Sequence, residues 1–463
     1  MTTQYLSSPK ALRCRLKANR TPFGFHAVQF GNMHAWCIGS LPIFTKQFNP
    51  NFKTKYFVLN VPLASVARQS PVVNPVVTCG DRAPRLYINI GSLPYFDNSS
   101  GIPRVAKELC RQGLLRDDVV CIPVYPEPRT GTYRVPLAWL KERQWLHLSR
   151  TLSVMPQEGT DKDPVITVQK GDWLIHTMVN RNEIAFMQSW MEDFRRKGGK
   201  VGFILHDLIP ENHPQFYRNR DVVQFRGWLS QIGHFDGIFA VSHATQNDYL
   251  QWCERRSVTS HPPIKFFHLG ANFKTSAVIQ GVLALPQLLN DSVPYFLMVS
   301  TLEPRKGHAQ VLDAFERLWN QGINVRCVFV GREGWKVRGL ARRIRKHKEW
   351  GRRLIWLDSV PDDELASIYR GAKAVIVASQ AEGFGLSVVE AMFYQRPLVL
   401  RDIPVFREIA GDDAFYFTGM DSQALSLVVL NELNSNFIPQ KRHLLTWAES
   451  FDQFFKLVKG MAS

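Results

Sequence analysis

The chain has 463 residues, of which 45% are hydrophobic and 12% aromatic, and it carries a formal net charge of +17. A chain of this length buries a large core, and its size favours two domains or three. No uninterrupted apolar stretch approaches the roughly 18 residues that a bilayer span needs, which argues against a membrane-spanning protein.

The seven cysteines are scattered, odd in number and form no CxxC pair. This distribution argues against a disulfide framework and a zinc site, and it favours reduced thiols. The first twenty residues also lack the apolar block of a secretory signal. We therefore expect a cytoplasmic protein.

The N-terminal segment differs from the rest of the chain in charge. Residues 1–80 contain nine Lys or Arg and no Asp or Glu. Three interpretations stay open: a basic extension that lies on anionic lipid, a transit peptide, or a start of translation assigned too early. We treat residues 1–84 as a basic N-terminal extension, either disordered or mis-assigned, whose place in the mature protein stays open.

From Arg85 to residue 270, short apolar runs alternate with amphipathic segments. This alternation predicts parallel strands joined by crossover helices, interrupted by an excursion at 126–164 that is rich in Pro, Arg and Trp. The predicted strands are 85–91, 119–125, 172–176, 200–207 and 236–242, and the predicted helices 101–115, 181–197 and 243–256.

The regular pattern stops at residues 271–293, which we interpret as an interdomain linker, and a second alternating series fills 294–440. The predicted fold is therefore α/β, with two doubly wound, Rossmann-like domains facing a cleft, where ligands bind beyond the carboxyl ends of the strands. Residues 441–463 read as a C-terminal helix with an apolar packing face. The second series has predicted strands at 295–300, 325–331, 353–358, 372–379 and 397–402.

The loop after the strand 295–300 reads "TLEPRKGH". It places Arg305 and Lys306 at the start of the next helix, beside backbone N–H groups. Two cations at a helix start suit a phosphate, although a solvated charged loop is the simpler interpretation of this loop alone.

The loop after the strand 372–379 opens the segment "SQAEGFGLSVVEAM". Gly383 and Gly385 permit tight turns that leave amides uncovered at the start of a helix near Leu386, which predicts an anion site. Glu382 and Glu390 can each accept hydrogen bonds from the vicinal hydroxyls of a sugar. Together these groups describe a nucleotide-sugar site, whereas a glycosidase acid–nucleophile pair would leave the amides and cations without a role.

Two further strand ends lie in the first half of the chain. His206 follows the strand 200–207 in "HDLIPENHP", and Gly101 opens a helix in "FDNSSGIPRV". A position at a strand end favours a functional histidine, although a lone histidine is more often structural. Ordinary helix capping by Ser99 or Ser100 is the alternative for the second turn.

These segments carry a resemblance. "TLEPRKGH", "VFVGREGW", "SQAEGFGLSVVEAM" and "RDIPVFREIAG" resemble the C-terminal domain of family-four glycosyltransferases, the retaining GT-B enzymes. "HDLIPENHP" and "DGIFAVSHAT" resemble parts of the N-terminal domain, so the resemblance covers about residues 85–460.

The resemblance implies roles for the acids and cations. Glu382 would hold hydroxyls of the transferred sugar, and Glu390 would hold the nucleotide ribose. Lys306, assisted by Arg305, would pair with the diphosphate.

It also implies roles for the turns and the histidine. The amides of Phe384 and Leu386, with those of Gly383 and Gly385 in the same turn, would face donor phosphate or sugar. His206 would contact the sugar near the reacting centre, and Gly101 would lie near the donor phosphates across the cleft.

The chemistry that the resemblance implies is retention of the anomeric configuration by front-face attack, without cofactor or metal. The segments "TLEPRKGH", "HDLIPENHP" and "RDIPVFREIAG" resemble those of bacterial enzymes that make the envelope polysaccharides O-antigen, capsule or exopolysaccharide, mannosyltransferases among them. GDP-mannose is therefore the favoured donor, with a UDP-sugar as the alternative, and a lipid-linked or oligosaccharide glycan is the expected acceptor.

Three residues depart from the family pattern. Thr301 stands where many relatives carry an arginine, a charge that Arg305 can supply. Ser387 replaces a usual proline, and Gln395 replaces a glycine common at the exit of the same helix. Thr301 lacks the positive charge that an arginine would add beside the phosphates, while Ser387 has no interpretation from the sequence.

Residues 332–353 hold ten Lys or Arg against two Glu. A solvated helix face is the simplest interpretation, and contact with an anionic membrane on the inner face of the cytoplasmic membrane is the functional one. The competing class is a nucleic-acid- or membrane-binding protein on an inactive glycosyltransferase-like scaffold. No nucleic-acid-binding motif supports it, and we expect no nucleic-acid partner.

Overall fold

A computed structural model divides the chain into two compact units, residues 1–72 and 73–463. The first unit contains a three-stranded antiparallel sheet in the order β1-β2-β3, within the segment 1–84 for which the sequence predicted no strand. Its strands are β1 (His26–Phe30), β2 (Met33–Ile38) and β3 (Leu41–Lys46). Besides these strands, the structure describes residues 84–96, 101–148, 163–178, 183–271, 289 and 292–462.

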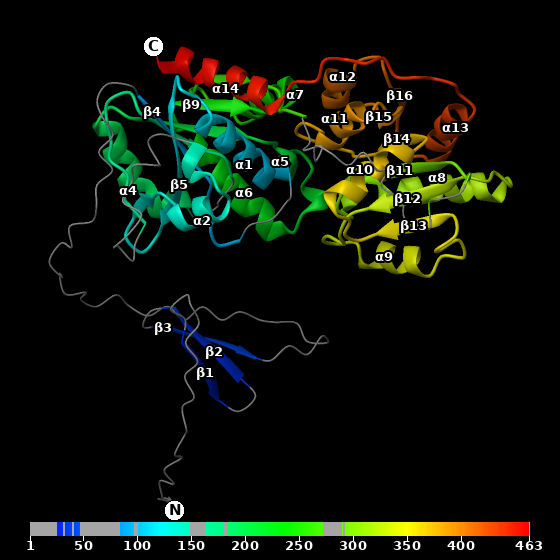
Figure 1. The fold of residues 1–463 in the computed structure, drawn as a ribbon, viewed down its shortest axis with the longest axis horizontal. Helices are drawn as coiled ribbons and strands as arrows, with labels where there is room; N and C mark the ends of the chain where they lie inside the picture. The colour runs from blue at the N-terminus through cyan, green and yellow to red at the C-terminus, as the bar shows by residue number, and fades with distance from the viewer. Residues whose placement is uncertain are drawn as a thin grey trace, which may run out of the picture. The chain divides into compact units, whose positions relative to one another are not determined.

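The second unit begins with a seven-stranded sheet in the order β10-β9-β8-β7-β4-β5-β6 (Figure 1). Its strands pair in parallel except β6, which runs antiparallel to β5 within the predicted excursion. The strands are β4 (Arg85–Asn89), β5 (Val120–Glu127), β6 (Thr132–Arg134), β7 (Trp173–His176), β8 (Lys200–Leu205), β9 (Gly237–Ala240) and β10 (Ile264–Phe266).

Helices connect these strands, as the alternation predicted. The helix α6 and the edge strand β10 were not predicted. The helices are α1 (Gly101–Leu114), α2 (Leu137–Glu142), α4 (Glu183–Arg196), α5 (Ile209–Asn212), α6 (Asn219–Ile232) and α7 (His243–Arg255), with short 3-10 turns η1 (Leu146–Leu148) and η2 (Pro214–Phe216).

A second, fully parallel sheet has the order β13-β12-β11-β14-β15-β16. The predicted linker 271–293 lies almost wholly outside the described residues. The strands are β11 (Tyr295–Val299), β12 (Arg326–Val330), β13 (Leu354–Leu357), β14 (Ala374–Val377), β15 (Leu398–Arg401) and β16 (Phe415–Phe417).

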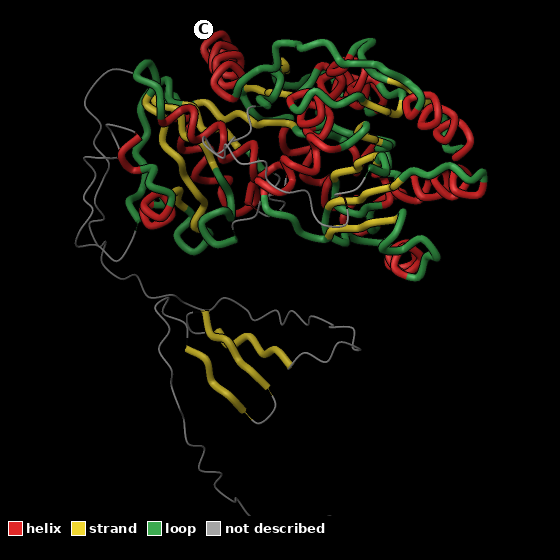
Figure 2. The backbone as a smooth tube through the Cα atoms, turned by 45° about the vertical axis from the view of Figure 1, so that its right-hand side comes forward, coloured by secondary structure: helices red, strands yellow, loops and turns green. Residues whose placement is uncertain are grey.

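The helices of this domain flank its sheet, and Figure 2 shows the strands of each domain running between helices. Both sheets are buried on both faces: β4, β12 and β14 have no exposed residue, as expected of parallel strands covered by crossover helices. The helices are α8 (His308–Asn320), α9 (Arg338–Arg345), α10 (Asp362–Gly371), α11 (Leu386–Phe393), α12 (Pro404–Ala410) and α13 (Ser422–Leu433), with the 3-10 turn η4 (Pro304–Lys306).

The last helix, α14 (Trp447–Ala462), returns to the first domain and lies beside β9 and α1 (Figure 1). Phe451 and Phe454 are fully buried in the core of that domain, and the ring of Phe454 lies 5.2 Å from that of Phe239. The apolar face predicted for residues 441–463 therefore packs on the first domain. Within the described part of the chain, no helix has both the length and the apolar character of a membrane span.

Candidate active site between the two domains

Glu382 lies between the two cations predicted to bind a phosphate. Lys306 Nζ is 2.5 Å from Glu382 Oε1, and Arg305 Nη1 is 3.1 Å from Oε2. The three side chains are 10–14% exposed. The loops after β11 and β14, 76 residues apart in the chain, thus form one buried charge cluster.

Burial and neighbouring charges shift the pKa values of this cluster in opposite directions. Burial would raise the pKa of Glu382, but the charges of Lys306 and Arg305 outweigh it and hold the pKa at about 2. Burial lowers the pKa of Lys306, opposed by Glu382, and the charge of Arg305 lowers it further. An anion bound next to Lys306 would raise this pKa.

The backbone holds the two loops in this arrangement. The Gln380 N–H donates to the Arg305 carbonyl at 2.8 Å, and Arg305 Nη1 donates to the Ala381 carbonyl at 3.0 Å. Gly307 has φ of 84°, and a Cβ there would lie 2.4 Å from the Ala378 carbonyl. Only glycine therefore fits after the two cations.

Arg305 also bonds to a second acid, through Nε to Glu303 Oε2 at 3.1 Å. Burial raises the pKa of Glu303, opposed by Arg305 and Lys306. Thr301, the position at which the resemblance led us to expect an arginine, is exposed, and the buried part of this loop begins at the next residue. Arg305 is thus held by two carboxylates and lies in the cluster in which a compensating charge was predicted.

Glu390 accepts one hydrogen bond from each of the two domains. Arg104 Nη1 on α1 donates to Glu390 Oε1 at 2.8 Å, and the Tyr369 hydroxyl on α10 donates to Oε2 at 2.7 Å. Neither Arg104 nor Tyr369 was predicted from the sequence as a site residue. A signal for Arg104 was present, since it lies three residues after Gly101 and therefore on the same face of α1.

The amides between the two acids stand at the start of α11. Gly385 has φ of 94° and is the residue before the helix. Among the residues that the structure describes, nothing accepts a hydrogen bond from the N–H groups of Phe384, Gly385 or Leu386. Unpaired N–H groups at the positive end of a helix favour an anionic ligand.

His206 and Gly101, the two first-domain residues named from the strand ends, lie next to the loop before α11 and the start of that helix. A Cβ on Gly383 would lie 1.7 Å from the His206 carbonyl oxygen, so glycine is required here by close approach of the two domains. A Cβ on Gly101 would lie 3.8 Å from Leu386 Cδ1, so Gly101 faces the start of α11. The capping alternative at Ser99 and Ser100 lies outside the described residues.

His206 is 7% exposed, and its Nε2–H donates to the Thr177 carbonyl at 2.7 Å. Burial lowers the pKa of His206, opposed by that hydrogen bond and by the charge of Asp207. The imidazole is therefore favoured as neutral, with Nδ1 as its acceptor. Such a ring can orient a hydroxyl or accept its proton.

Phe384 makes a contact that the sequence did not predict. Its ring is 5% exposed and belongs to the hydrophobic core of the first domain, 5.8 Å from the ring of His268. The loop after β14 thus inserts a side chain into the opposite domain, while its amides stay at the start of α11.

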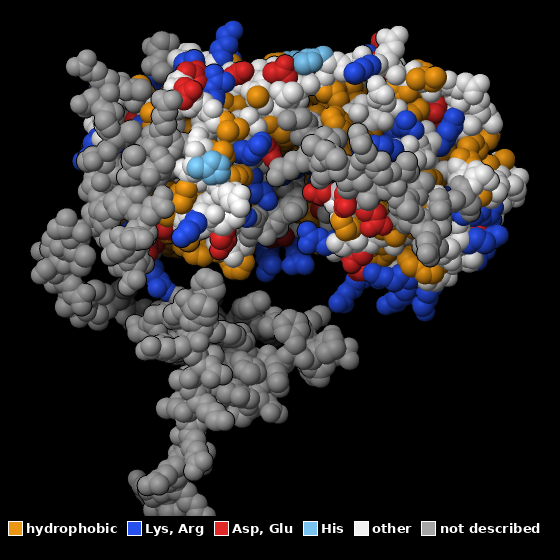
Figure 3. All heavy atoms as spheres, viewed as in Figure 1, with side chains coloured by type: hydrophobic (Ala, Val, Ile, Leu, Met, Phe, Trp, Pro, Cys, Tyr) orange, Lys and Arg blue, Asp and Glu red, His pale blue; other side chains and the backbone are white. Residues whose placement is uncertain are grey.

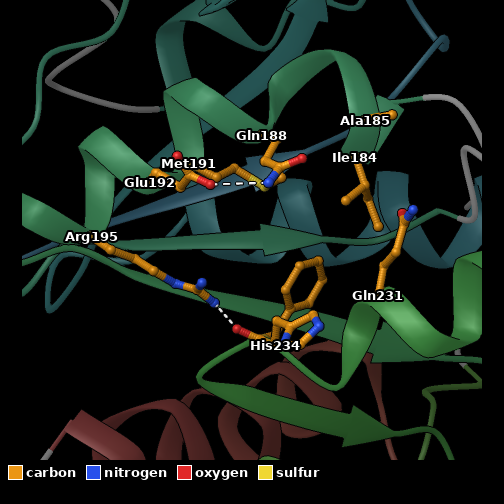
Figure 4. A pocket seen from close by; sticks show the side chains of 9 residues that line it. Ile184, Ala185, Gln188, Met191, Glu192, Arg195, Gln231 and His234 are labelled. Atoms are coloured by element: carbon orange, nitrogen blue, oxygen red, sulfur yellow. Dashed lines mark hydrogen bonds between the residues drawn. The ribbon is translucent and has the colours of Figure 1, made fainter.

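A separate pocket of about 550 Å³ lies between α4 and α6, and it contains none of the predicted site residues (Figure 4). Two of its polar side chains are already hydrogen-bonded: Gln188 donates to the Glu192 carboxylate, and Arg195 donates to the backbone carbonyl of His234. The pocket is lined by Ile184, Ala185, Gln188, Met191, Glu192, Arg195, Gln231, His234 and Phe235.

Within the described residues, no group of three or more His, Cys, Asp or Glu side chains is placed to hold a metal ion. That the protein works without a metal stays a prediction. Four described cysteines are buried free thiols: Cys110, Cys121, Cys253 and Cys327.

Comparison with known proteins agrees with the predicted family. Residues 286–443 match the family "Glycosyl transferases group 1". The serotype-specific mannosyltransferase WbdA of Escherichia coli is 33% identical over 385 residues, which are 80% of this chain and 46% of that protein. The O-antigen chain mannosyltransferase B of Escherichia coli is 29% identical over 145 residues, 31% of this chain and 37% of that protein. The chain spans less than half the length of these relatives.

Solved structures share the fold. Anabaena Alr3699/HepE, in complex with UDP and glucose, covers 82% of this chain and 97% of its own with a TM-score of 0.51 and 16% identity. The N-terminal domain of Candida albicans trehalose-6-phosphate phosphatase covers 83% and 99%, with a TM-score of 0.57 and 13% identity. Together with the two parallel sheets, these likenesses confirm the predicted GT-B fold.

Proposed function

Because residues 286–443 form a glycosyl transferases group 1 domain, we propose that the chain is a retaining hexosyltransferase. It moves a hexose from a nucleotide-diphosphate sugar to a lipid-linked or oligosaccharide acceptor in envelope-polysaccharide biosynthesis. One observation carries this proposal: the Glu382–Lys306–Arg305 cluster adjoins the unpaired amides at the start of α11, and both face the first domain.

In this proposal the diphosphate lies against the amides of Phe384, Gly385 and Leu386 and beside Lys306 and Arg305. The leaving diphosphate gains negative charge in the transition state, so cations and amides that are already oriented lower the barrier. Binding of this anion would also raise the pKa of Lys306, which burial lowers in the unliganded cluster.

The two carboxylates hold the rest of the donor. Glu382 takes sugar hydroxyls and Glu390 takes the ribose. Each carboxylate oxygen has two acceptor positions, so the present bonds to Lys306, Arg305, Arg104 and Tyr369 leave room for hydroxyl donors. His206 contacts the sugar near the reacting centre, and Gly101 leaves space for the phosphates.

Mannose is the favoured sugar and GDP-mannose the favoured donor, with a UDP-sugar as the alternative. Relatives described as mannosyltransferases support mannose. Calorimetry with GDP, GDP-mannose, UDP and UDP-glucose tests the base and the sugar together. Tight binding of the UDP compounds and not of the GDP compounds would replace the favoured donor and leave the reaction class standing.

Transfer itself is tested by incubating the protein with a bound donor and lipid-linked oligosaccharide acceptors, and by NMR of the product linkage. An axial donor bond that stays axial supports retention, and an inverted linkage contradicts it. Binding of nucleic acid with a steep salt dependence, without binding of any sugar nucleotide, would favour the inactive-scaffold alternative.

The basic face of α9 supports a contact with an anionic membrane, where a lipid-linked acceptor is presented. Arg343 and Arg345 pair with acids, whereas Arg338, Arg342 and Lys346 are exposed and have no acidic partner among the described residues. Lys and Arg side chains gather along the lower edge of the second domain in Figure 3, where Figure 1 places α9.

Vesicles of phosphatidylcholine with and without phosphatidylglycerol test this contact. Replacing Arg338, Arg342 and Lys346 together by alanine should weaken binding to the anionic vesicles by roughly 10- to 100-fold. Replacing Arg343 and Arg345, which are already paired, is the matched control. Equal binding by the triple variant and the wild type would contradict the membrane contact.

A further inference from the structure

The start of α7 in the first domain touches the loop that precedes α11. The Ser242 hydroxyl donates to the Gly383 carbonyl at 2.6 Å, and the Thr245 hydroxyl donates to the same oxygen at 3.0 Å. Both side chains are buried, with 0% and 1% exposed. Two buried donors from one domain thus hold a single backbone carbonyl of the other.

A held carbonyl also determines the direction of the next amide. A trans peptide is planar, so its C=O and N–H point in opposite directions, and the described residues contain no cis peptide. With the Gly383 oxygen bonded to α7, the Phe384 N–H must point away from α7. That N–H is the first of the three unpaired amides at the start of α11.

A second contact fixes α7 itself against the second domain. Glu408 on α12 accepts hydrogen bonds from the N–H groups of His243 at 2.7 Å and Ala244 at 2.8 Å. The His268 Nε2 lies 2.6 Å from the same carboxylate. A carboxylate accepts hydrogen bonds from the N–H groups at the start of a helix and interacts favourably with its positive end. This contact therefore stabilises the packing of α7 against α12.

From these contacts we infer that Ser242 and Thr245 are positioning residues that orient the phosphate-binding amides, with Glu408 holding the start of α7 in place. The amide site is then complete only when the two domains are in contact. Gly383 is part of the same interdomain contact, since the His206 carbonyl leaves no space for a Cβ there. The assignment of these amides to a diphosphate rests on the proposed function; their orientation by α7 does not.

Thr245→Val tests the inference, because valine keeps the shape and removes only the hydroxyl. The first readout is hydrogen exchange of the segment 380–390 in the unliganded protein. We expect faster exchange of the Val388 and Val389 amides, which donate to the Gly385 carbonyl at the start of α11, in Thr245→Val and recovery in Thr245→Ser. Ser426→Ala is the control, since Ser426 is a buried hydroxyl of α13 that bonds to Gln423, away from α7.

Glu408→Gln is the second variant, because it retains an acceptor of the same size without the charge. It should also speed exchange at Val388 and Val389. Exchange at these two amides that is unchanged in both variants, relative to Ser426→Ala, would overturn the inference whatever the protein binds.

The second readout is affinity for the sugar nucleotide that the wild type binds. Thr245→Val should weaken it by ~5-fold, the effect of leaving one buried acceptor short of a donor, with little change for Ser426→Ala. Unchanged affinity in Thr245→Val would remove the role in donor binding. A wild type that binds no sugar nucleotide, while the exchange effect persists, would refute the proposed function and leave the positioning role intact.

Discussion

The two carboxylates of one short segment, Glu382 and Glu390, lie in different kinds of site. Glu382 takes both of its cations, Lys306 and Arg305, from its own domain. Glu390 takes its cation, Arg104, from the opposite domain. The first site is therefore formed by the fold of one domain, whereas the second depends on how the two domains meet.

The difference distinguishes contacts that one domain supplies alone from contacts that form only where the two domains meet. A ligand group at Glu382 meets a charge cluster that the second domain supplies alone. A ligand group at Glu390 meets a carboxylate oriented by a helix of the first domain, close to the Gly101 that opens the same helix. Substitutions of Glu382 and of Glu390 should consequently have different effects.

Glu382→Ala is expected to have the largest effect. It removes the carboxylate proposed to hold the sugar and leaves Lys306 buried without the carboxylate that it contacts. Turnover with the preferred donor should fall by about 10²- to 10³-fold, the usual loss for one oriented electrostatic contact. Steady-state kinetics measures this, and circular dichroism checks the fold. Turnover equal to that of the wild type would take Glu382 out of the site.

Glu432 is a second buried carboxylate of the same domain, and unlike Glu382 it has no cation in hydrogen-bonding contact among the described residues. Its side chain is 0% exposed, its oxygens accept no hydrogen bond among the described residues, and Lys373 Nζ is 4.0 Å away. Burial raises its pKa to about 7, opposed by Lys373, whereas the pKa of Glu382 is about 2. Similar burial thus gives opposite shifts, depending on whether cations are in contact.

The raised pKa means that the folded state binds the Glu432 proton more tightly than the unfolded state. Its contribution to stability is complete below the unfolded pKa of about 4.5 and is lost as the pH rises through about 7. Glu432→Gln should therefore raise the free energy of unfolding by ~2 kcal/mol at pH 8 and change it little at pH 4. Urea unfolding at the two pH values measures the difference.

Glu349→Gln is the matched control for that experiment. Hydrogen bonds from Arg353, with the charges of Arg353 and Arg352, lower the pKa of Glu349 to about 2. Neutralising it should destabilise the protein at pH 8. Stabilisation by both glutamines, or by neither, would contradict the assigned environments.

Arg104→Ala tests the cross-domain site. Glu390 would keep its bond from Tyr369 and lose its cation, so donor affinity should fall by ~10-fold while the second domain keeps its stability. Arg104→Lys should restore part of the affinity, since lysine keeps the charge and loses the fork geometry. Donor binding by calorimetry, with thermal unfolding alongside, measures both. A fall in stability with unchanged affinity would make the pair merely structural.

Gln395→Gly is expected to have the smallest effect. Gln395 follows the end of α11 with φ of 53°, a conformation that favours glycine. The glycine that the resemblance led us to expect at this position would adopt this conformation without strain. The substitution should raise the free energy of unfolding by ~0.5–1 kcal/mol without changing activity, and thermal unfolding would show it. A loss of stability would mean that the glutamine side chain stabilises the helix end.

The sequence predicted the strands inside the sheets better than those at their edges. Runs such as Tyr295–Val299 and Ala374–Val377 are continuous and apolar because both faces of the strand are buried. The three-residue edge strands β10 and β16 give too short a signal, and α6 was hidden by its exposed Val223 and an internal Gly227. The helix α14 was predicted, but not the domain that it packs against.

The chemical groups at the strand ends could be predicted from the sequence: acids, paired cations, a histidine and glycine turns. Local chemistry decides these, because a glycine, a helix start and an apolar strand act within a few residues. The partners of these groups became known from the folded structure. Arg104 meets Glu390 across 286 residues, and Ser242 meets the Gly383 carbonyl across 141. Such contacts depend on how the two sheets and their helices pack together, and a local sequence pattern does not specify that packing.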